Sequence, residues 1–155
     1  MMTQPLKIGV LGSGPAGQTL ATGFLDKGHP VMIGSRDSTK LDGWLHHAGP
    51  GAQIGSFAET AEFGDVVLLS VLGSAAEEVV RLAGVENLTG KIVIDASDPL
   101  DFSSGQPGLF VGTTDSLGER VQRIVPGAYV VKALNIVQAD VMINPRLTGD
   151  EPDMF

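Results

Sequence analysis

The sequence predicts an α/β protein in which a doubly wound parallel sheet lies between two layers of helices, as a single domain over residues 1–155. Short apolar runs alternate along the chain with segments of helical periodicity, which is the strand, helix, strand order of a parallel sheet. A glycine-rich turn joins the first apolar run to the first helical segment. The composition agrees, because 43% hydrophobic and 18% charged residues suit a sheet covered on both faces.

Charge and composition exclude several classes of protein. With 18 acidic and 10 basic residues the net charge is −8, whereas nucleic-acid-binding proteins normally present a basic surface, so we expect no nucleic-acid partner. The chain has no cysteine, which excludes disulfides, thiolate nucleophiles and zinc–thiolate sites. No uninterrupted apolar run is long enough to span a bilayer, so we expect no membrane partner and a cytoplasmic location.

The glycine-rich turn indicates a dinucleotide site, the alternative being a tight turn without a ligand. An apolar run over residues 7–11 leads into a G-x-G-x-x-G pattern, and residues 15–27 have helical spacing. Gly12 allows unusual dihedral angles, Gly14 lets the backbone approach a pyrophosphate, and Gly17 lets the helix pack closely on the strand. The helix N-terminus adds unpaired amides that attract phosphate. The residues predicted to bind the dinucleotide here are Gly12, Ser13, Gly14, Pro15, Ala16 and Gly17.

The end of the second predicted strand, residues 29–34, indicates which dinucleotide binds. In dinucleotide-binding folds the residues after this strand meet the adenosine ribose, where an acidic residue selects NAD. Ser35, Arg36 and Lys40 instead offer a hydroxyl, a planar guanidinium and an ammonium to a 2′-phosphate, so we predict NADP(H). The alternative for Arg36 is a solvated surface cation. Asp37 is also placed to reach the ribose, but we expect it to cap the next helix.

The rest of the chain continues the alternation of helices and strands. Ser56 and Glu59 have the spacing of a capping box at the start of a helix. The adjacent His46 and His47 point about 100° apart on a helix, so we expect a solvated helix end there and no metal site. In chain order we expect a helix over 39–48, a strand over 52–55, a helix over 56–63, a strand over 65–71, a helix over 75–82, a strand over 90–95, a loop over 101–112, a helix over 114–124 and a strand over 128–134.

Two of these strands end in residues suited to a ligand. In open α/β sheets, ligands bind beyond the carboxyl ends of the strands. The residues placed there are Ser70, Val71 and Leu72 after the strand over 65–71, and Ser97 and Asp98 after the strand over 90–95. A plain Asp-Pro turn is the alternative explanation for Asp98. The sequence contains no pattern of a catalytic triad, a carboxylate pair or a metal site, so the catalytic residue is unknown.

With these segments placed, the chain resembles the NADP-dependent oxidoreductases that work with the deazaflavin coenzyme F420. The resemblance extends over nearly the whole chain. It rests on Gly12-Ser13-Gly14-Pro15-Ala16-Gly17, on Ile33-Gly34-Ser35-Arg36 with Lys40, on Asp95-Ala96-Ser97-Asp98-Pro99-Leu100, and on Val130-Val131-Lys132-Ala133-Leu134-Asn135.

The resemblance implies a Rossmann-type fold with NADP(H) across the glycine turn and the 2′-phosphate on Ser35, Arg36 and Lys40. It also implies that coenzyme F420, as co-substrate, lies over the nicotinamide. Hydride then passes directly between two rings, a step that needs apposition and exclusion of water more than an acid or a base. The residues implied around the two rings are Leu72, Ser97, Pro99, Ala133 and Asn135.

The chain departs from the family on the side of this second substrate. Leu72-Gly73 stands where archaeal members have a proline and an aromatic residue, Asn135 replaces a histidine, and Asp98 replaces an asparagine. Family members also continue with a strand and C-terminal helices that help to close the site and build the dimer. We therefore expect a domain without that segment and keep a homodimer as an expectation, with the apolar Met154 and Phe155 exposing a sheet edge or recruiting a partner.

Three functions remain open at this stage. The first is transfer of hydride between NADP(H) and a deazaflavin or similar acceptor, and the second is an NADPH-dependent flavin or ferric reductase. The third is a non-catalytic module that binds NADP(H) and senses its redox state. Turnover separates the third function from the first two, and the choice of acceptor separates these.

Overall fold

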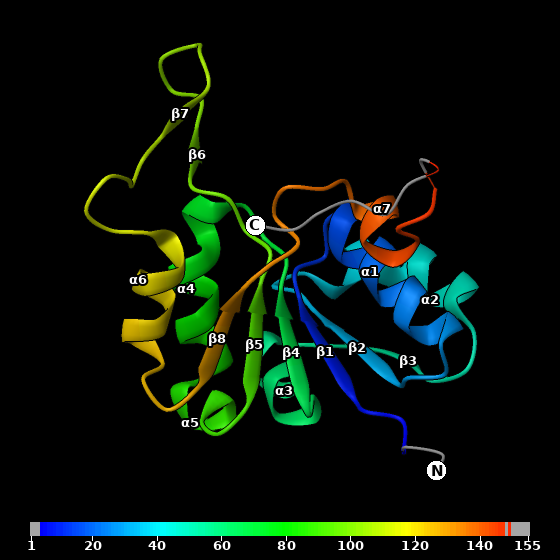
Figure 1. Ribbon diagram of the computed structural model, residues 1–155. Helices are drawn as coiled ribbons and strands as arrows, with labels where there is room; N and C mark the ends of the chain where they lie inside the picture. Colours follow the sequence, from blue (N-terminus) through cyan, green and yellow to red (C-terminus); the bar gives the residue numbers. More distant parts are fainter. Residues whose placement is uncertain (1–3, 148, 150–155) are drawn as a thin grey trace.

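Six parallel strands form the central sheet of the computed structural model, which describes residues 4–147 and 149 (Figure 1). The strands lie in the order β3-β2-β1-β4-β5-β8, so the chain winds from β1 to one edge and then from β4 to the other. This order confirms the predicted doubly wound, Rossmann-type sheet. The strands are β1 (Ile8–Leu11), β2 (Val31–Gly34), β3 (Ala52–Gly55), β4 (Val66–Leu69), β5 (Ile92–Asp95) and β8 (Tyr129–Lys132).

Helices lie on both faces of the sheet, which confirms the predicted three layers. In Figure 1 the first helix layer is to the right of the sheet and the second is mostly to the left. The first layer contains α1 (Pro15–Asp26), α2 (Asp42–Ala48) and α7 (Ala139–Ile143). The second contains α3 (Phe57–Phe63), α4 (Gly73–Ala83), α5 (Val85–Leu88) and α6 (Leu117–Ile124).

Alternate residues of the central strands enter two separate apolar cores. On β1, Val10 packs in the core that contains Leu20 of α1. Its neighbour Leu11 packs in the core that contains Val80 of α4, because successive side chains of a strand point to opposite faces. The centre of the sheet is thus buried on both sides. Its carboxyl edge therefore has a rigid base for the loops that follow.

Helix α3 begins at the predicted capping box and packs closely on the sheet. The Ser56 hydroxyl accepts a hydrogen bond from the Glu59 amide at 3.2 Å, and the Glu59 carboxylate accepts one from the Ser56 amide at 2.7 Å. The hydrogen bonds that the Glu59 carboxylate accepts from Ser56, the one from the backbone amide first, hold the pKa of Glu59 below its ordinary value. A Cβ at Gly9 would lie 2.5 Å from the carbonyl oxygen of Thr60, so glycine on β1 permits this close approach.

Replacement of Thr60 by valine is expected to stabilise the protein. Thr60 is fully buried, and its hydroxyl has no hydrogen-bond partner within the part of the chain that the structure describes. A buried hydroxyl without a partner costs free energy, and valine removes it at similar volume. We expect Thr60→Val to raise the free energy of unfolding by about 1 kcal/mol in urea denaturation. An unchanged or lower value would show that the hydroxyl is satisfied in solution.

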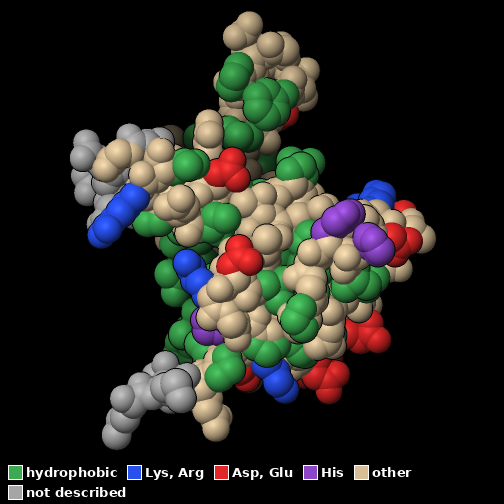
Figure 2. Space-filling view, turned by 90° about the vertical axis from the view of Figure 1, so that its right-hand side faces the viewer, with side chains coloured by type: hydrophobic (Ala, Val, Ile, Leu, Met, Phe, Trp, Pro, Cys, Tyr) green, Lys and Arg blue, Asp and Glu red, His purple; other side chains and the backbone are tan. Residues whose placement is uncertain are grey.

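The structure differs from the predicted elements in several places. Residues 39–48 do not form one helix, because a 3₁₀ helix, η1 (Ser38–Leu41), precedes α2. The short helices α5 and α7 were not expected. The segment 101–112 is not only a loop, because it belongs to an antiparallel hairpin of β6 (Leu100–Asp101) and β7 (Gly108–Leu109). This hairpin projects beyond the carboxyl edge of the sheet (Figure 1), and Figure 2 shows apolar side chains on it.

The helix layer that contains α1 does not extend over β5 and β8. Ile92, Tyr129 and Val131 are 45%, 67% and 46% exposed. Ile92 pairs with Tyr129 and Val131 pairs with Ile94, which packs in the core on the α1 side, so these apolar residues share one face. That face is open among the described residues. The end of the chain at 154–155, predicted to expose a sheet edge or recruit a partner, lies outside them.

Candidate functional site

A cavity of about 560 Å³ opens at the carboxyl ends of β1, β2 and β4. The glycine-rich turn forms its floor, the end of β2 forms one wall, and apolar residues of α3 and α4 form the opposite wall. We call it the nucleotide cavity. It is lined by Gly12, Ser13, Gly14, Pro15, Ala16, Ser35, Arg36, Asp37, Lys40, Phe57, Ser70, Val71, Leu72, Ala75, Val79 and Ala96.

The three glycines of the turn have different surroundings. Gly12 has a φ of +134°, and a Cβ there would lie 2.0 Å from the carbonyl oxygen of Ser70. A Cβ at Gly17 would lie 2.2 Å from the carbonyl oxygen of Gly12, so both positions need glycine for the fold itself. Gly14 is exposed, lines the cavity, and a Cβ there would meet nothing within 4 Å. The space in front of Gly14 at the N-terminus of α1 therefore fits a pyrophosphate.

Ser35 joins the end of β2 to the glycine-rich turn. Its side chain is only 9% exposed, and its hydroxyl lies 3.0 Å from the Ser13 hydroxyl and 2.9 Å from the carbonyl oxygen of Asp37. It also accepts a hydrogen bond from the Asp37 amide at 3.2 Å. Ser35 thus ties the wall at the end of β2 to the floor of the cavity. Its predicted contact with a 2′-phosphate stays a prediction.

Asp37 caps η1, as predicted for the start of the next helix. Its carboxylate accepts hydrogen bonds from the Thr39 hydroxyl at 2.6 Å and the Thr39 amide at 3.1 Å. The bond from the hydroxyl, followed by that from the amide, holds the pKa of Asp37 below its ordinary value. The capping interaction occupies one carboxylate oxygen of the acidic residue nearest to the predicted ribose site. This geometry favours the cationic side chains beside it as the groups that select the dinucleotide.

Arg36 and Lys40 lie exposed at the rim of the nucleotide cavity. The guanidinium of Arg36 is 4.0 Å from the carboxylate of Glu78 on α4, and the two side chains are 71% and 62% exposed. Val79, the next residue of α4, lines the cavity, so the ion pair crosses from one wall to the other. The rim therefore contains two cations suited to a phosphate and one carboxylate that pairs with one of them.

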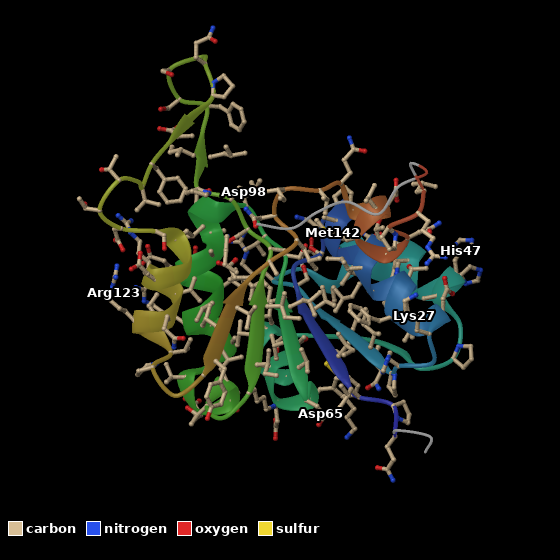
Figure 3. The ribbon with its side chains drawn as sticks, viewed as in Figure 1. Lys27, His47, Asp65, Asp98, Arg123 and Met142 are labelled. Carbon is tan, nitrogen blue, oxygen red and sulfur yellow. The ribbon has the colours of Figure 1, made fainter. Side chains whose placement is uncertain are left out.

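A second cavity of about 590 Å³ adjoins the first and shares Val71, Leu72 and Ala96 with it. It lies between the N-terminus of α4, the loop after β5 and the β6–β7 hairpin, and we call it the hairpin cavity. Asp98, labelled in Figure 3, lies at the base of the hairpin. The residues that line it are Val71, Leu72, Gly73, Ser74, Ala96, Ser97, Asp98, Leu100, Asp101, Phe102 and Phe110. Its walls are thus apolar with two carboxylates, and no lysine or arginine is among these residues.

An ion pair between the buried Asp95 carboxylate and the partly exposed Lys132 side chain fixes the loop after β5. Asp95 is fully buried and accepts hydrogen bonds from the Ser97 amide at 3.0 Å and the Ser97 hydroxyl at 2.5 Å. The ammonium of Lys132, at the end of β8, lies 3.2 Å from the Asp95 carboxylate and also donates to the carbonyl oxygen of Ser97. The pair therefore ties the ends of two neighbouring strands to the start of the loop.

The segment after β8 returns toward the same loop. Asn135 donates a hydrogen bond to the Asp98 carboxylate at 3.1 Å, and Leu134 before it has a φ of +68°. A positive φ is rare for leucine and is maintained only where the surroundings enforce it. Leu134 packs against the core on the α1 side, which provides such surroundings. This turn brings two of the residues at which the chain departs from the family pattern, Asn135 and Asp98, into direct contact.

The structure gathers most of the predicted site residues around the two cavities. Eleven of them line the nucleotide cavity and Ser97 lines the hairpin cavity, whereas Gly17, Pro99, Ala133 and Asn135 line neither. Sequence reasoning missed the apolar wall of Phe57, Ala75 and Val79, because these residues look like ordinary helix-core positions. It also missed Phe102 and Phe110 of the hairpin cavity, which come from the segment read as a loop.

The helices and the ionisable side chains of the described residues have two further features. None of their helices is long and apolar enough to cross a membrane. Their acidic and histidine side chains form no cluster of three or more that a metal ion would need, and His46 and His47 are exposed.

Comparisons with known proteins show the family of the chain. The family model described as "NADP oxidoreductase coenzyme F420-dependent" matches residues 7–99, which contain both the glycine turn and the loop after β5. A solved structure from Arthrobacter sp. FB24, a candidate F420-dependent NADP-reductase, is 41% identical with a TM-score of 0.86. The match covers 91% of this chain and 67% of that one.

Two further relatives extend the comparison. A hypothetical protein from Sinorhizobium meliloti is 28% identical with a TM-score of 0.76, and the match covers 94% of this chain and 69% of that structure. The metalloreductase STEAP3 of Rattus norvegicus is 29% identical over 133 residues, which are 86% of this chain but 25% of the relative. The chain therefore spans about a quarter of this curated relative. Because the family model matches more than half of the chain, the protein belongs to the coenzyme F420-dependent NADP oxidoreductase family.

Proposed function

We propose that this chain is an NADP(H)-dependent oxidoreductase domain that transfers hydride between the nicotinamide and a deazaflavin, coenzyme F420, or a similar ring. The observation that carries the proposal is the pair of adjoining cavities. One has the phosphate-binding features of a dinucleotide site, and the other begins at Val71, Leu72 and Ala96, where the first ends. A dinucleotide extended from the end of β2 across the glycine turn would bring its nicotinamide to this junction.

The reaction needs little from the protein beyond binding and orientation. NADPH, the oxidised acceptor and one proton give NADP⁺ and the reduced acceptor, with the hydride moving from the nicotinamide to the acceptor ring and the proton coming from water. In this proposal, the glycine turn holds the pyrophosphate and Arg36 and Lys40 hold the 2′-phosphate. Leu72, 81% exposed between the cavities, shields the rings from water.

The charge of the hairpin cavity bears on how an acceptor would enter it. Asp98 and Asp101 line it without a lysine or arginine among the lining residues, so an anionic group inside it would be repelled. We propose that only the ring enters and that an acidic tail, such as a phosphate, stays outside. This arrangement admits a deazaflavin and a flavin alike.

A second candidate is an NADPH-dependent flavin or ferric reductase. The similarity to the rat metalloreductase favours it, although that relative is about four times as long as the matched region. The third candidate is a module that binds NADP(H) without turnover. We keep a single domain over residues 1–155, a homodimer and a cytoplasmic location as parts of the proposal.

The test is a titration with NADPH and NADH, followed by an acceptor panel. The panel contains coenzyme F420, 8-hydroxy-5-deazariboflavin, riboflavin and FMN, so that each ring is offered with and without an acidic tail. Oxidation of NADPH with bleaching of the deazaflavin supports the first function, and turnover with flavin alone supports the second. NADPH binding without any turnover supports the third, and absence of dinucleotide binding rejects the proposal.

Arg36→Glu is expected to weaken NADPH binding far more than NADH binding. Arginine is suited to bidentate contact with a phosphate, and glutamate would repel it. We expect the Kd of NADPH to rise by about 100-fold and that of NADH by less than about 3-fold, measured by fluorescence titration. Lys27→Glu, which makes the same charge change at an exposed residue outside the cavity, is the control. An equal loss for both dinucleotides would contradict the role of Arg36.

A further inference from the structure

We propose that Glu78 is a specificity-determining residue that competes with the 2′-phosphate of NADP(H) for Arg36. The inference rests on the proposed function, because it assumes that Arg36 binds that phosphate. Glu78 belongs to none of the sequence motifs from which the dinucleotide site was predicted. Glu78 lies on α4 next to Val79, which lines the wall of the nucleotide cavity opposite the end of β2.

The geometry places Glu78 where it acts on Arg36. The two side chains form an ion pair at 4.0 Å, and both are mostly exposed. Exposed ion pairs are weak, so the pair is easily exchanged for a stronger partner. A phosphate carries more charge than a carboxylate and offers three acceptor oxygens, so it would displace Glu78 from the guanidinium. Glu78 thus acts as an anionic substitute that holds Arg36 across the cavity until the dinucleotide arrives.

The other charges near Arg36 do not have this effect. Asp37 is next to it in the chain, but its carboxylate accepts two hydrogen bonds from Thr39 at the start of η1. Lys40 is a cation and favours a phosphate. Glu78 is therefore the carboxylate that forms an ion pair with Arg36 among the described residues, and its own negative charge also opposes a phosphate.

The neighbouring residue Glu77 provides a matched control. Its carboxylate pairs with Arg81 at 3.2 Å and with Arg120 at 3.6 Å, whereas that of Glu78 pairs with Arg36. Glu77→Gln and Glu78→Gln remove the same charge from adjacent positions of one helix. A difference between the two variants in dinucleotide binding therefore reports on position and not on net charge.

The experiment measures the Kd of NADPH and of NADH for the wild type, Glu77→Gln, Glu78→Gln, Arg36→Gln and the double variant Arg36→Gln/Glu78→Gln. We expect Glu78→Gln to tighten NADPH binding by about 3- to 5-fold at about 0.1 M salt, where exposed charges still interact over about 10 Å. NADH binding and the Glu77→Gln variant should stay within about 1.5-fold of the wild type. The gain should shrink toward none at about 1 M salt, and it should be smaller when Arg36 is already glutamine.

Several outcomes would overturn the inference while leaving the proposed function intact. A wild type that prefers NADPH, together with unchanged or weaker NADPH binding in Glu78→Gln, would show that the ion pair is neutral or helps to position Arg36. An equal gain with and without Arg36 would show a general charge effect in place of competition. A wild type with no preference for NADPH over NADH would reject the proposed NADP(H) site, and the inference with it.

Discussion

Gly14→Val is expected to abolish NADPH binding while the protein stays folded. Gly14 is the N-cap residue of α1 with φ −72° and ψ 174°, a backbone conformation that valine adopts readily. A Cβ there meets no atom within 4 Å, so the protein itself has room for a side chain. The same room is where the pyrophosphate would lie against the backbone. The substitution is therefore expected to weaken dinucleotide binding and not folding.

We expect the Kd of NADPH and that of NADH to rise by at least about 100-fold, because the pyrophosphate is common to both. The free energy of unfolding should change by less than about 0.5 kcal/mol, as for an exposed substitution without strain. Calorimetric titration and urea denaturation measure the two quantities on the same sample. Unchanged dinucleotide affinity in folded Gly14→Val would reject the glycine-turn model of the site.

Gly12→Val is the contrasting variant within the same turn. Its φ of +134° is a conformation that side chains rarely adopt, and its Cβ would lie 2.0 Å from a backbone oxygen of Ser70. This variant is expected to lose stability together with binding. The pair of variants therefore separates a glycine that the ligand requires from a glycine that the fold requires.

The sheet and its glycine turn were predictable because each depends on local sequence. Apolar runs indicate strands at β1, β4 and β5 from local sequence, and the capping box of Ser56 and Glu59 is set by spacing alone. The cap by Asp37 follows for the same reason. Features that depend on a few neighbouring residues could therefore be predicted from the sequence.

Contacts between distant segments could not be predicted from the sequence. Glu78 and Arg36 are 42 positions apart, and no spacing rule predicts that α4 brings one to the other. The β6–β7 hairpin has strands of two residues, and the glycine, serine and proline between them indicate a loop. Nothing in the residue type of Leu134 indicates a positive φ, because packing of the finished fold enforces it.

Lys132→Met is expected to lower the free energy of unfolding by about 3 kcal/mol, because it leaves the buried Asp95 carboxylate without its cation. Asp95 is fully buried, whereas the Lys132 side chain is 34% exposed, so water that reaches the site keeps the loss near the lower end for buried ion pairs. The hydrogen bonds from Ser97 remain and offset part of the buried charge. Urea denaturation at neutral pH measures the loss.

Two further variants test whether the unpaired charge is the cause. Asp95→Asn in the Lys132→Met background removes the charge and keeps an oxygen that accepts from the Ser97 amide, so it should recover at least about 1 kcal/mol of the loss. Lys27→Met removes an exposed ammonium at the C-terminal end of α1 and should change the free energy of unfolding by less than about 0.5 kcal/mol. If the double variant is no more stable than Lys132→Met, the loss comes from the packing of the lysine stem. The ion pair would then not be what fastens the loop after β5 to β8.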